Sequence, residues 1–428
     1  MYYSYDFITL GGTMTDTTTR ASTRTQTSQR PSKAVGTAML GALALLAAVS
    51  PLATDLYLPA FPDMASDLAT TSAGVQLSLT AFMIGAGVGQ VVFGPLSDRV
   101  GRRVPLLVGT VVFLLASVGA ALAPTIGILI ALRVLQGLGG AAGMVIGRAV
   151  IADRAHGAEA VKAQTLMMLV GGVAPVVAPL LGSFLADAIG WRGLLSVLAV
   201  FGLACVVAVV TLVPETRTVE ARRAELTVWQ ETRVGLSALR NRAYLGHTAA
   251  FAFAFATMMA YISASPFIYQ DLIGLGTVQY GLAFGLNALL LMATSAVAAN
   301  LTGKVHTRRL AAVGLGITLV AVITLTVVAS SSAPAWTLMI PVAFAIAPLG
   351  LVFGSTTALA LDSAPEAPGM ASAALGLGQF ALAGLVAPLV SLGGEDTAVP
   401  MALVMLVSAA IASIALRLAG RGADTLDG

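Results

Sequence analysis

Residues 94–103 join two long apolar segments and read Gly-Pro-Leu-Ser-Asp-Arg-Val-Gly-Arg-Arg. Gly101 can adopt a positive φ, which a tight turn between two helices requires. Asp98 lies at the apolar boundary and needs a partner there, because an unpaired carboxylate is costly beside hydrocarbon. Arg99, Arg102 and Arg103 place positive charge on one side of the connection. The stretch therefore predicts a short, basic turn between two membrane-spanning helices.

The composition of the whole chain points the same way. Of its 428 residues 57% are apolar and 10% are charged, whereas about 25% are charged in a typical soluble domain. The mean hydropathy is +0.90. Such a chain would expose large apolar patches in water, which argues against a soluble enzyme, a disordered chain or a nucleic-acid binder. The single cysteine, Cys205, excludes an intrachain disulfide, and the sequence predicts no metal site.

Long stretches without Asp, Glu, Lys or Arg mark the membrane spans. A bilayer core needs about 20 apolar residues in a helix. The longest stretch, 310–361, is interrupted at residues 330–334 and counts as two spans. A second division, at Ala123-Pro124, places Arg133 inside a helix. The total is twelve helices, built from the stretches 34–54, 68–97, 104–132, 134–147, 163–186, 193–214, 243–270, 272–303, 310–361, 367–394 and 397–416.

The placement of basic residues supports this count. With twelve spans, 20 of the 23 Lys and Arg residues fall on one side, and the exceptions are Arg133, Arg148 and Arg192. By the positive-inside rule, both termini are expected in the cytoplasm of a multi-pass plasma-membrane protein.

Composition also divides the chain into segments. Residues 1–33 are rich in Thr and Ser and lack an apolar signal core, so we expect a disordered cytoplasmic tail, with Met1 or Met14 as its start. Residues 214–242 form the longest hydrophilic connection and predict a cytoplasmic linker. It separates an N-terminal six-helix bundle (34–213) from a C-terminal one (243–420), which a short cytoplasmic tail (421–428) follows. A weak echo of residues 96–100 at 301–305 suggests that the two bundles are related.

Residues 94–103 resemble the signature between helices 2 and 3 of the major facilitator superfamily, G-x-L-a-D-r-x-G-r-k. The resemblance implies an all-α polytopic membrane protein with twelve transmembrane helices in two six-helix bundles. It also implies a cytoplasmic charge network of Asp98, Arg102 and Asp153 that links helices 2, 3, 4 and 11 in the outward-open state. Arg148 either joins this network or extends to the membrane interface. The expected conformational switch comprises Gly94, Asp98, Arg99, Gly101, Arg102, Arg103, Arg148 and Asp153.

Residues 133–137 read Arg-Val-Leu-Gln-Gly and resemble the family's R-x-x-q-G motif in helix 4. Arg133 lies about 12 Å from the start of its helix. At that depth an arginine must face protein or water and have a partner. Gln136 lies one turn deeper on nearly the same face. Small residues at Gly139, Gly143 and Gly147 predict close helix packing.

Asp55 is the only carboxylate well inside a predicted span, about 7 Å from its external end. Arg133 is expected in the same half of the membrane. Our hypothesis is that Asp55 couples transport to protons, with Arg133 as its partner or electrostatic modulator. The alternative is a static ion pair with a structural role.

The stretch around Asp55, Asp-Leu-Tyr-Leu-Pro-Ala-Phe-Pro, resembles the bicyclomycin/chloramphenicol-resistance branch of the drug:proton antiporters. Pro179 and Gly182 match two positions of that family's antiporter motif, G-P-x-x-G-G. Ala178 and Ser183 depart from its outer glycines, so helix 5 alone is weaker evidence for antiport.

The second half carries adaptable Met and aromatic side chains that suit a cavity for apolar ligands, although packing explains any single one. The candidate cavity residues are Asp55, Tyr57, Gln136, Met258, Tyr261 and Asn287.

These features predict a secondary active efflux transporter that exchanges a drug or antibiotic for protons. Polar cavity residues are few, which disfavours the alternative, a proton-coupled transporter of a sugar or amino-acid derivative. The chain lacks a phosphate-binding loop and any paired nucleophile and base inside its spans, so it predicts neither a primary pump nor an enzyme, and no catalytic residues. We expect a monomer in the lipid bilayer that uses no cofactor and binds no nucleic acid.

Overall fold

A computed structural model describes residues 36–155, 157–217, 241–365, 368–391 and 397–420. The predicted tails, 1–33 and 421–428, and residues 218–240 of the predicted linker lie outside these ranges. The described residues form helices and their connections, with one isolated bridge between Thr302 and Val305. The predicted all-α class is confirmed.

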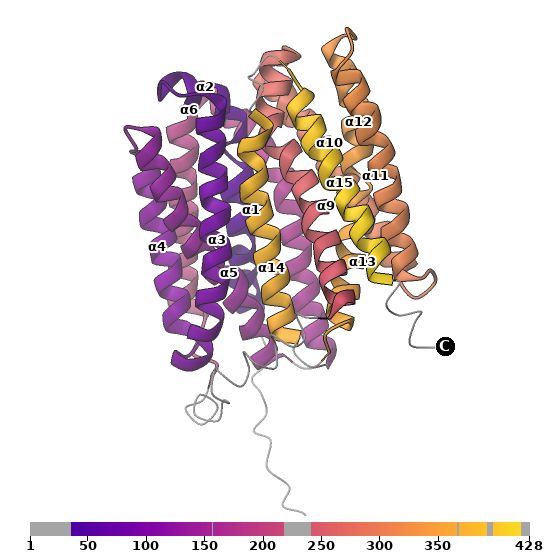
Figure 1. The fold of residues 1–428 in the computed structure, drawn as a ribbon. Helices are drawn as coiled ribbons and strands as arrows, with labels where there is room; N and C mark the ends of the chain where they lie inside the picture. Colours follow the sequence, from indigo (N-terminus) through magenta and orange to yellow (C-terminus); the bar gives the residue numbers. More distant parts are fainter. Residues whose placement is uncertain (1–35, 156, 218–240, 366–367, 392–396, 421–428) are drawn as a thin grey trace, which may run out of the picture. The chain divides into compact units, whose positions relative to one another are not determined.

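Residues 36–217, called the first half here, form six α-helices and one short 3-10 helix (Figure 1). In chain order they are α1 (Thr37–Asp55), η1 (Leu58–Ala60), α2 (Phe61–Asp67), α3 (Ser72–Val100), α4 (Arg103–Ala121), α5 (Ile126–Arg154) and α6 (Gly157–Leu212).

Residues 241–420, the second half, continue the pattern. In chain order the elements are α9 (Arg242–Phe267), η2 (Ile268–Leu272), α10 (Thr277–Leu301), α11 (Thr307–Ala329), η3 (Ala335–Leu338), α12 (Met339–Ile346), α13 (Leu349–Asp362), α14 (Pro368–Val386), η4 (Ala387–Ser391) and α15 (Val399–Gly420).

Within the described ranges, eleven helical stretches are long and apolar enough to cross a membrane. One of them, Thr165–Leu212, is far longer than a bilayer requires. Its backbone leaves the helical region at Gly190, where φ is 63° and ψ is 179°. This positive φ divides α6 into two spans where the sequence predicts a connection, so the two halves of α6 bring the count to the predicted twelve.

Helix ends follow local sequence signals. The hydroxyl of Thr71 accepts a hydrogen bond from the backbone N–H of Gly74 at 3.3 Å and caps α3. The side chain of Asn241 accepts one from Ala243 at 2.9 Å and caps α9. Such caps satisfy backbone donors that have no partner in the first turn of a helix.

Helices pack within each half and also across the two halves. In the first half α3 and α4 pack against α5, and α1 and α4 pack against α6. In the second half α9 packs against α13, α14 and α15. Across the halves, α3 meets α14 and α6 meets α10. The division into two bundles remains a prediction, because the contacts group residues 34–428 as one unit.

Two glycines set a close crossing of α3 and α5 in the first half. A Cβ placed on Gly85 of α3 would lie 2.0 Å from the carbonyl oxygen of Val134 in α5. One placed on Gly137 would lie 2.0 Å from the carbonyl oxygen of Phe82. The backbones of α3 and α5 therefore touch directly, which places Arg133 deep in the first half.

Candidate functional site

The first membrane span is interrupted at Asp55. Asp55 is the last residue of α1, and the chain passes through Tyr57 into η1 and then α2. Pro59 and Pro62 follow, and proline lacks the backbone N–H that a regular helix needs. The side chain of Asp55 is only 4% exposed. A carboxylate is thus buried where the helix is interrupted, an arrangement typical of ion and substrate sites in transporters.

Arg133 of α5 lies beside this interruption and is fully buried. Its Nη2 donates to the carbonyl oxygen of Ala53 at 2.9 Å and to the hydroxyl of Tyr57 at 3.1 Å. Its Nε donates to the carbonyl oxygen of Ser78 at 3.3 Å, and its Nη1 donates to Oε1 of Gln136. The guanidinium also lies 4.6 Å from the ring centroid of Tyr57. Arg133 therefore ties α5 to both sides of Asp55.

Two serines extend this network. Gln136 donates from Nε2 to the hydroxyl of Ser117 in α4 at 2.7 Å. The hydroxyl of Tyr57 shares a hydrogen bond of 3.0 Å with that of Ser78 in α3. The sequence analysis did not select these serines, because their partners come from other helices and no motif marks them.

Asp55 and Arg133 do not form an ion pair in this structure. The ion pairs among the described residues join Arg102, Arg192 and Arg217 to other carboxylates. The structure therefore shows neither the static ion pair nor Arg133 as a direct ion-pair partner of Asp55. A carboxylate without a cationic partner at this depth is costly to ionise, so its charge depends strongly on its surroundings.

A second polar network faces the site from the second half. Asn287 of α10 donates from Nδ2 to the hydroxyl of Tyr261 at 2.9 Å and to that of Tyr269 at 3.3 Å. The hydroxyls of Tyr280 and Ser265 share a hydrogen bond of 3.2 Å. Direct contacts between η1 and α10 place this network beside the segment that follows Asp55. The sequence analysis selected Tyr261 and Asn287 and missed Tyr269 and Tyr280.

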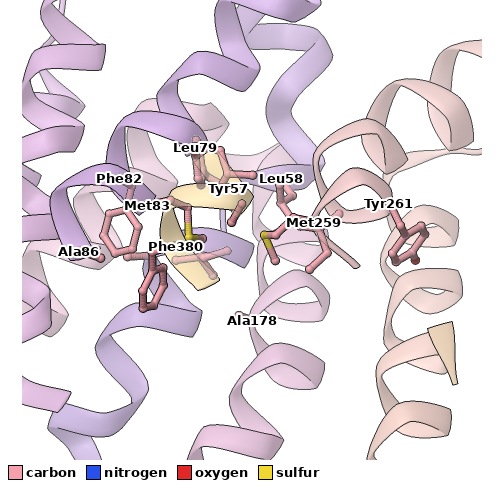
Figure 2. Close-up of a cluster of buried hydrophobic side chains, with 14 of the residues drawn as sticks. Tyr57, Leu58, Leu79, Phe82, Met83, Ala86, Ala178, Met259, Tyr261 and Phe380 are labelled. Atoms are coloured by element: carbon pink, nitrogen blue, oxygen red, sulfur yellow. The ribbon is translucent and has the colours of Figure 1, made fainter. Parts of the chain in front are cut away.

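The predicted cavity residues thus fall into two groups. Tyr57 and Gln136 belong to the Arg133 network, whereas Tyr261 and Asn287 belong to the tyrosine network. Met258 is half-buried and packs against the apolar core. Figure 2 shows Tyr57 and Leu58 near Met83, Met259 and Phe380, with Tyr261 farther to the side. Buried apolar side chains of both halves therefore meet beside the interrupted helix.

The predicted antiporter motif lies on α6 against this interruption. A Cβ placed on Gly182 would lie 1.9 Å from the carbonyl oxygen of Leu56 and 3.3 Å from the ring of Pro59. On an adjoining part of the α6 surface, a Cβ on Gly281 of α10 would lie 2.3 Å from Oγ of Ser183 and 3.3 Å from the carbonyl oxygen of Pro179. The motif therefore holds the interrupted helix against α6 and brings α10 to the same level.

The predicted charge network assembles around Arg102. Its Nη1 donates to Oδ1 of Asp98 at 2.5 Å and its Nε donates to Oδ2 of Asp153 at 3.0 Å. Ser97 accepts a further hydrogen bond from Nη1 at 2.8 Å. Gly101 has a φ of 110°, as the predicted tight turn requires. This arginine joins the ends of α3 and α5 at the turn before α4.

Residues 215–217 add four hydrogen bonds that were not predicted from the sequence. Glu215 accepts hydrogen bonds from the backbone N–H groups of Arg102 and Arg103, at 2.9 and 3.2 Å. The hydroxyl of Thr216 donates to Asp153 at 2.8 Å, and Nη1 of Arg217 donates to Asp98 at 2.8 Å. Burial lowers the pKa of Arg102, but the hydrogen bonds and charges of Asp153 and Asp98 raise it above its ordinary value overall. Arg102 therefore stays charged at every working pH.

The other predicted switch residues lie at the margin of this network. Arg103 donates to the carbonyl oxygen of Val210 at 2.7 Å, and Arg99 is exposed. Gly94 accepts a hydrogen bond from the hydroxyl of Ser97 at 2.9 Å. Arg148 is exposed and forms no ion pair with the carboxylate partners of Arg102 among the described residues, and its extension to the membrane interface stays a prediction.

Comparisons with known proteins agree with this architecture. A family model described as the Major Facilitator Superfamily matches residues 43–388. An uncharacterized MFS-type transporter of Bacillus subtilis (strain 168), YdgK, is 35% identical over 87% of this chain and 93% of its own. A bicyclomycin resistance protein homolog of Haemophilus influenzae is 29% identical over 85% of this chain and 91% of its own.

A solved structure shares the fold. A bacterial homolog of the human lysosomal transporter Spinster, in an inward-facing and occupied conformation, superimposes with a TM-score of 0.71. The match covers 90% of this chain and 96% of the other at 16% sequence identity, which supports the fold alone.

Proposed function

Because the chain belongs to the major facilitator superfamily, and within it to the bicyclomycin/chloramphenicol-resistance branch, we propose that it exports antibiotics or other drugs in exchange for protons. It is a multi-pass membrane transporter. Three points go beyond family membership and are proposed here. They are the substrate class, the coupling to protons, and a location in the plasma membrane with both termini in the cytoplasm.

The observation that carries this proposal is the environment of Asp55. The carboxylate is buried at the interruption of the first span, beside an arginine whose donors serve other acceptors. A carboxyl group in such a place binds and releases a proton in response to small changes around it. Buried apolar side chains of both halves lie beside it, and each half contributes a polar network that contains tyrosines, a combination that suits a site for an apolar cargo.

Contacts between the halves support alternating access. Nε2 of Gln270 donates to the carbonyl oxygen of Pro59 at 2.9 Å, and the ring centroids of Phe61 and Phe267 are 6.1 Å apart. These contacts join the halves at the end of the helices opposite the Arg102 network. In the proposed cycle, separation there opens Asp55 to one side, and rearrangement of the Arg102 network accompanies closure at the other end.

Drug susceptibility tests this proposal. Cells that express the chain should tolerate more bicyclomycin or chloramphenicol than cells with an Asp55→Asn variant at equal expression, and an uncoupler of the pH gradient should abolish the difference. Asp187→Asn, an exposed carboxylate of α6, is the matched control and should behave as the wild type. Unchanged susceptibility across apolar and chloramphenicol-like compounds would contradict drug efflux and favour a metabolite as cargo.

A further inference from the structure

Asp55 and Tyr280 belong to opposite halves but lie at the same level of α6. Leu56, next to Asp55, packs its carbonyl oxygen on Gly182. Gly281, next to Tyr280, packs on Ser183. Because Gly182 and Ser183 are consecutive, α6 presents the neighbours of Asp55 and of Tyr280 on adjoining parts of its surface. Direct contacts between η1 and α10 also join the two regions.

The donors around Asp55 are limited. Arg133 on α5 directs its guanidinium to Ala53, Ser78, Tyr57 and Gln136. The hydroxyl of Thr54, the neighbour of Asp55, donates to the carbonyl oxygens of Ser50 and Pro51 within α1, at 3.2 and 3.0 Å. Since a buried carboxylate is costly to ionise without donors, another group must supply them when the proton leaves.

Titratable side chains of the two networks come from both halves. They are Arg133 on α5 and Tyr57 after α1 in the first half, and Tyr261 on α9, Tyr269 on η2 and Tyr280 on α10 in the second. The hydroxyls of Tyr261 and Tyr269 are engaged by Asn287, and that of Tyr57 by Arg133 and Ser78.

Tyr280 differs from these tyrosines because its hydroxyl has a serine as its partner and, in the part of the chain that the structure describes, receives no hydrogen bond from Arg133 or Asn287. It is fully buried, and its hydroxyl shares a hydrogen bond of 3.2 Å with Ser265, longer than is typical for two hydroxyls. Beside it, Oγ of Ser183 is buried without a hydrogen-bond partner among the described residues. Buried hydroxyls normally have hydrogen-bond partners. The unpartnered hydroxyl of Ser183 therefore leaves unused hydrogen-bonding capacity where the two halves meet.

We propose that Tyr280 is a positioning residue for Asp55. In this structure its hydroxyl bonds to Ser265. When the Asp55 carboxylate loses its proton, movement where the two halves meet brings the Tyr280 hydroxyl to the carboxylate, and proton binding reverses the change. The proton state of Asp55 in the first half thereby sets a hydrogen bond to the second half. This inference rests on the proposed function, since it states how the coupling carboxylate communicates across the halves.

Infrared difference spectroscopy of the purified full-length chain tests this role without any drug. The band of the protonated Asp55 carboxyl is identified by its loss in Asp55→Asn and is titrated with pH. Removal of the phenolic donor in Tyr280→Phe favours the protonated form, so the midpoint should move upward by about one pH unit. The frequency of the band should change as well. Tyr269→Phe, which removes a hydroxyl held by Asn287, is the matched control and should leave the midpoint in place.

A second variant provides an independent test in case Tyr280→Phe does not fold. Ser265→Ala removes the competing partner of the Tyr280 hydroxyl, so the midpoint should move downward. An unchanged midpoint in either folded variant overturns the proposal, and so does an equal shift in Tyr269→Phe. The outcome is independent of the proposed function, because a titrating band with no drug transport would contradict antiport while leaving the positioning role intact.

Discussion

Gly182→Ala should disrupt the contact between α6 and the interrupted first span. The added Cβ would lie 1.9 Å from the carbonyl oxygen of Leu56, whereas real Cβ contacts stay beyond 3.0 Å. The backbones must therefore separate by about 1.1 Å, since neither atom belongs to a flexible side chain. Overpacking of this kind costs about 1–3 kcal/mol. The displaced segment carries Asp55 and Tyr57, so transport should fall together with thermal stability.

The matched control is Gly172→Ala on the same helix, where a Cβ would meet nothing within 4 Å. Alanine is the better helix former by about 1 kcal/mol, so this variant should be as stable as the wild type or more so. Both variants are purified in detergent, heated, and scored by the fraction that remains monodisperse in size-exclusion chromatography. If Gly182→Ala matches Gly172→Ala in both stability and transport, the close contact does not exist and the argument fails.

Three further changes test other parts of the site. Arg133→Lys should lower stability by about 1–3 kcal/mol, because one ammonium cannot reach all four acceptors and leaves buried oxygens unsatisfied; a melting temperature equal to that of the wild type would contradict this. Glu215→Ala should cost about 1 kcal/mol, because it removes the carboxylate at the N-terminus of α4, and unchanged denaturation would refute the cap. Asp153→Asn keeps the shape but removes the charge that faces Arg102, so it should slow transport more than drug binding; a pure loss of binding affinity would speak against a role in the switch.

The helices could be predicted because the bilayer sets their length. Apolar stretches near 20 residues can satisfy their backbone in hydrocarbon only as helices. The stretch 34–54 thus appears as α1 and 397–416 as α15. The division at Ala123-Pro124 is observed between α4 and α5.

The network around Arg102 was partly predictable, because its members share one turn and the family motif names them. Asp98 and Gly101 lie within a few residues of Arg102, and Asp153 ends the helix that carries Arg133. Glu215 and Arg217 were not predictable, since they read as the start of a charged linker. Glu215 is negative and lies against the basic turn, and Arg217 is positive and pairs with Asp98. This charge complementarity was the one sequence feature that could have pointed to these contacts.

The partners of the two central residues were beyond sequence reasoning. Arg133 binds carbonyl oxygens of Ala53 and Ser78, and a backbone acceptor leaves no trace in residue type. Tyr280 reaches the level of Asp55 only because α6 packs closely against both α1 and α10. Its neighbour Gly281 is four residues from Gly285, a spacing that favours close helix packing but does not identify the helix that it meets.

Drug-driven proton movement in proteoliposomes tests whether Asp55 couples drug export to the uptake of protons. Vesicles that contain the purified chain and an internal pH indicator receive chloramphenicol or bicyclomycin on one side under an imposed pH gradient. The account predicts drug-dependent dissipation of the gradient by the wild type and by Asp187→Asn, and none by Asp55→Asn, although that variant folds and still binds the drug. Equal drug-dependent proton flux in the wild type and in Asp55→Asn would contradict the account.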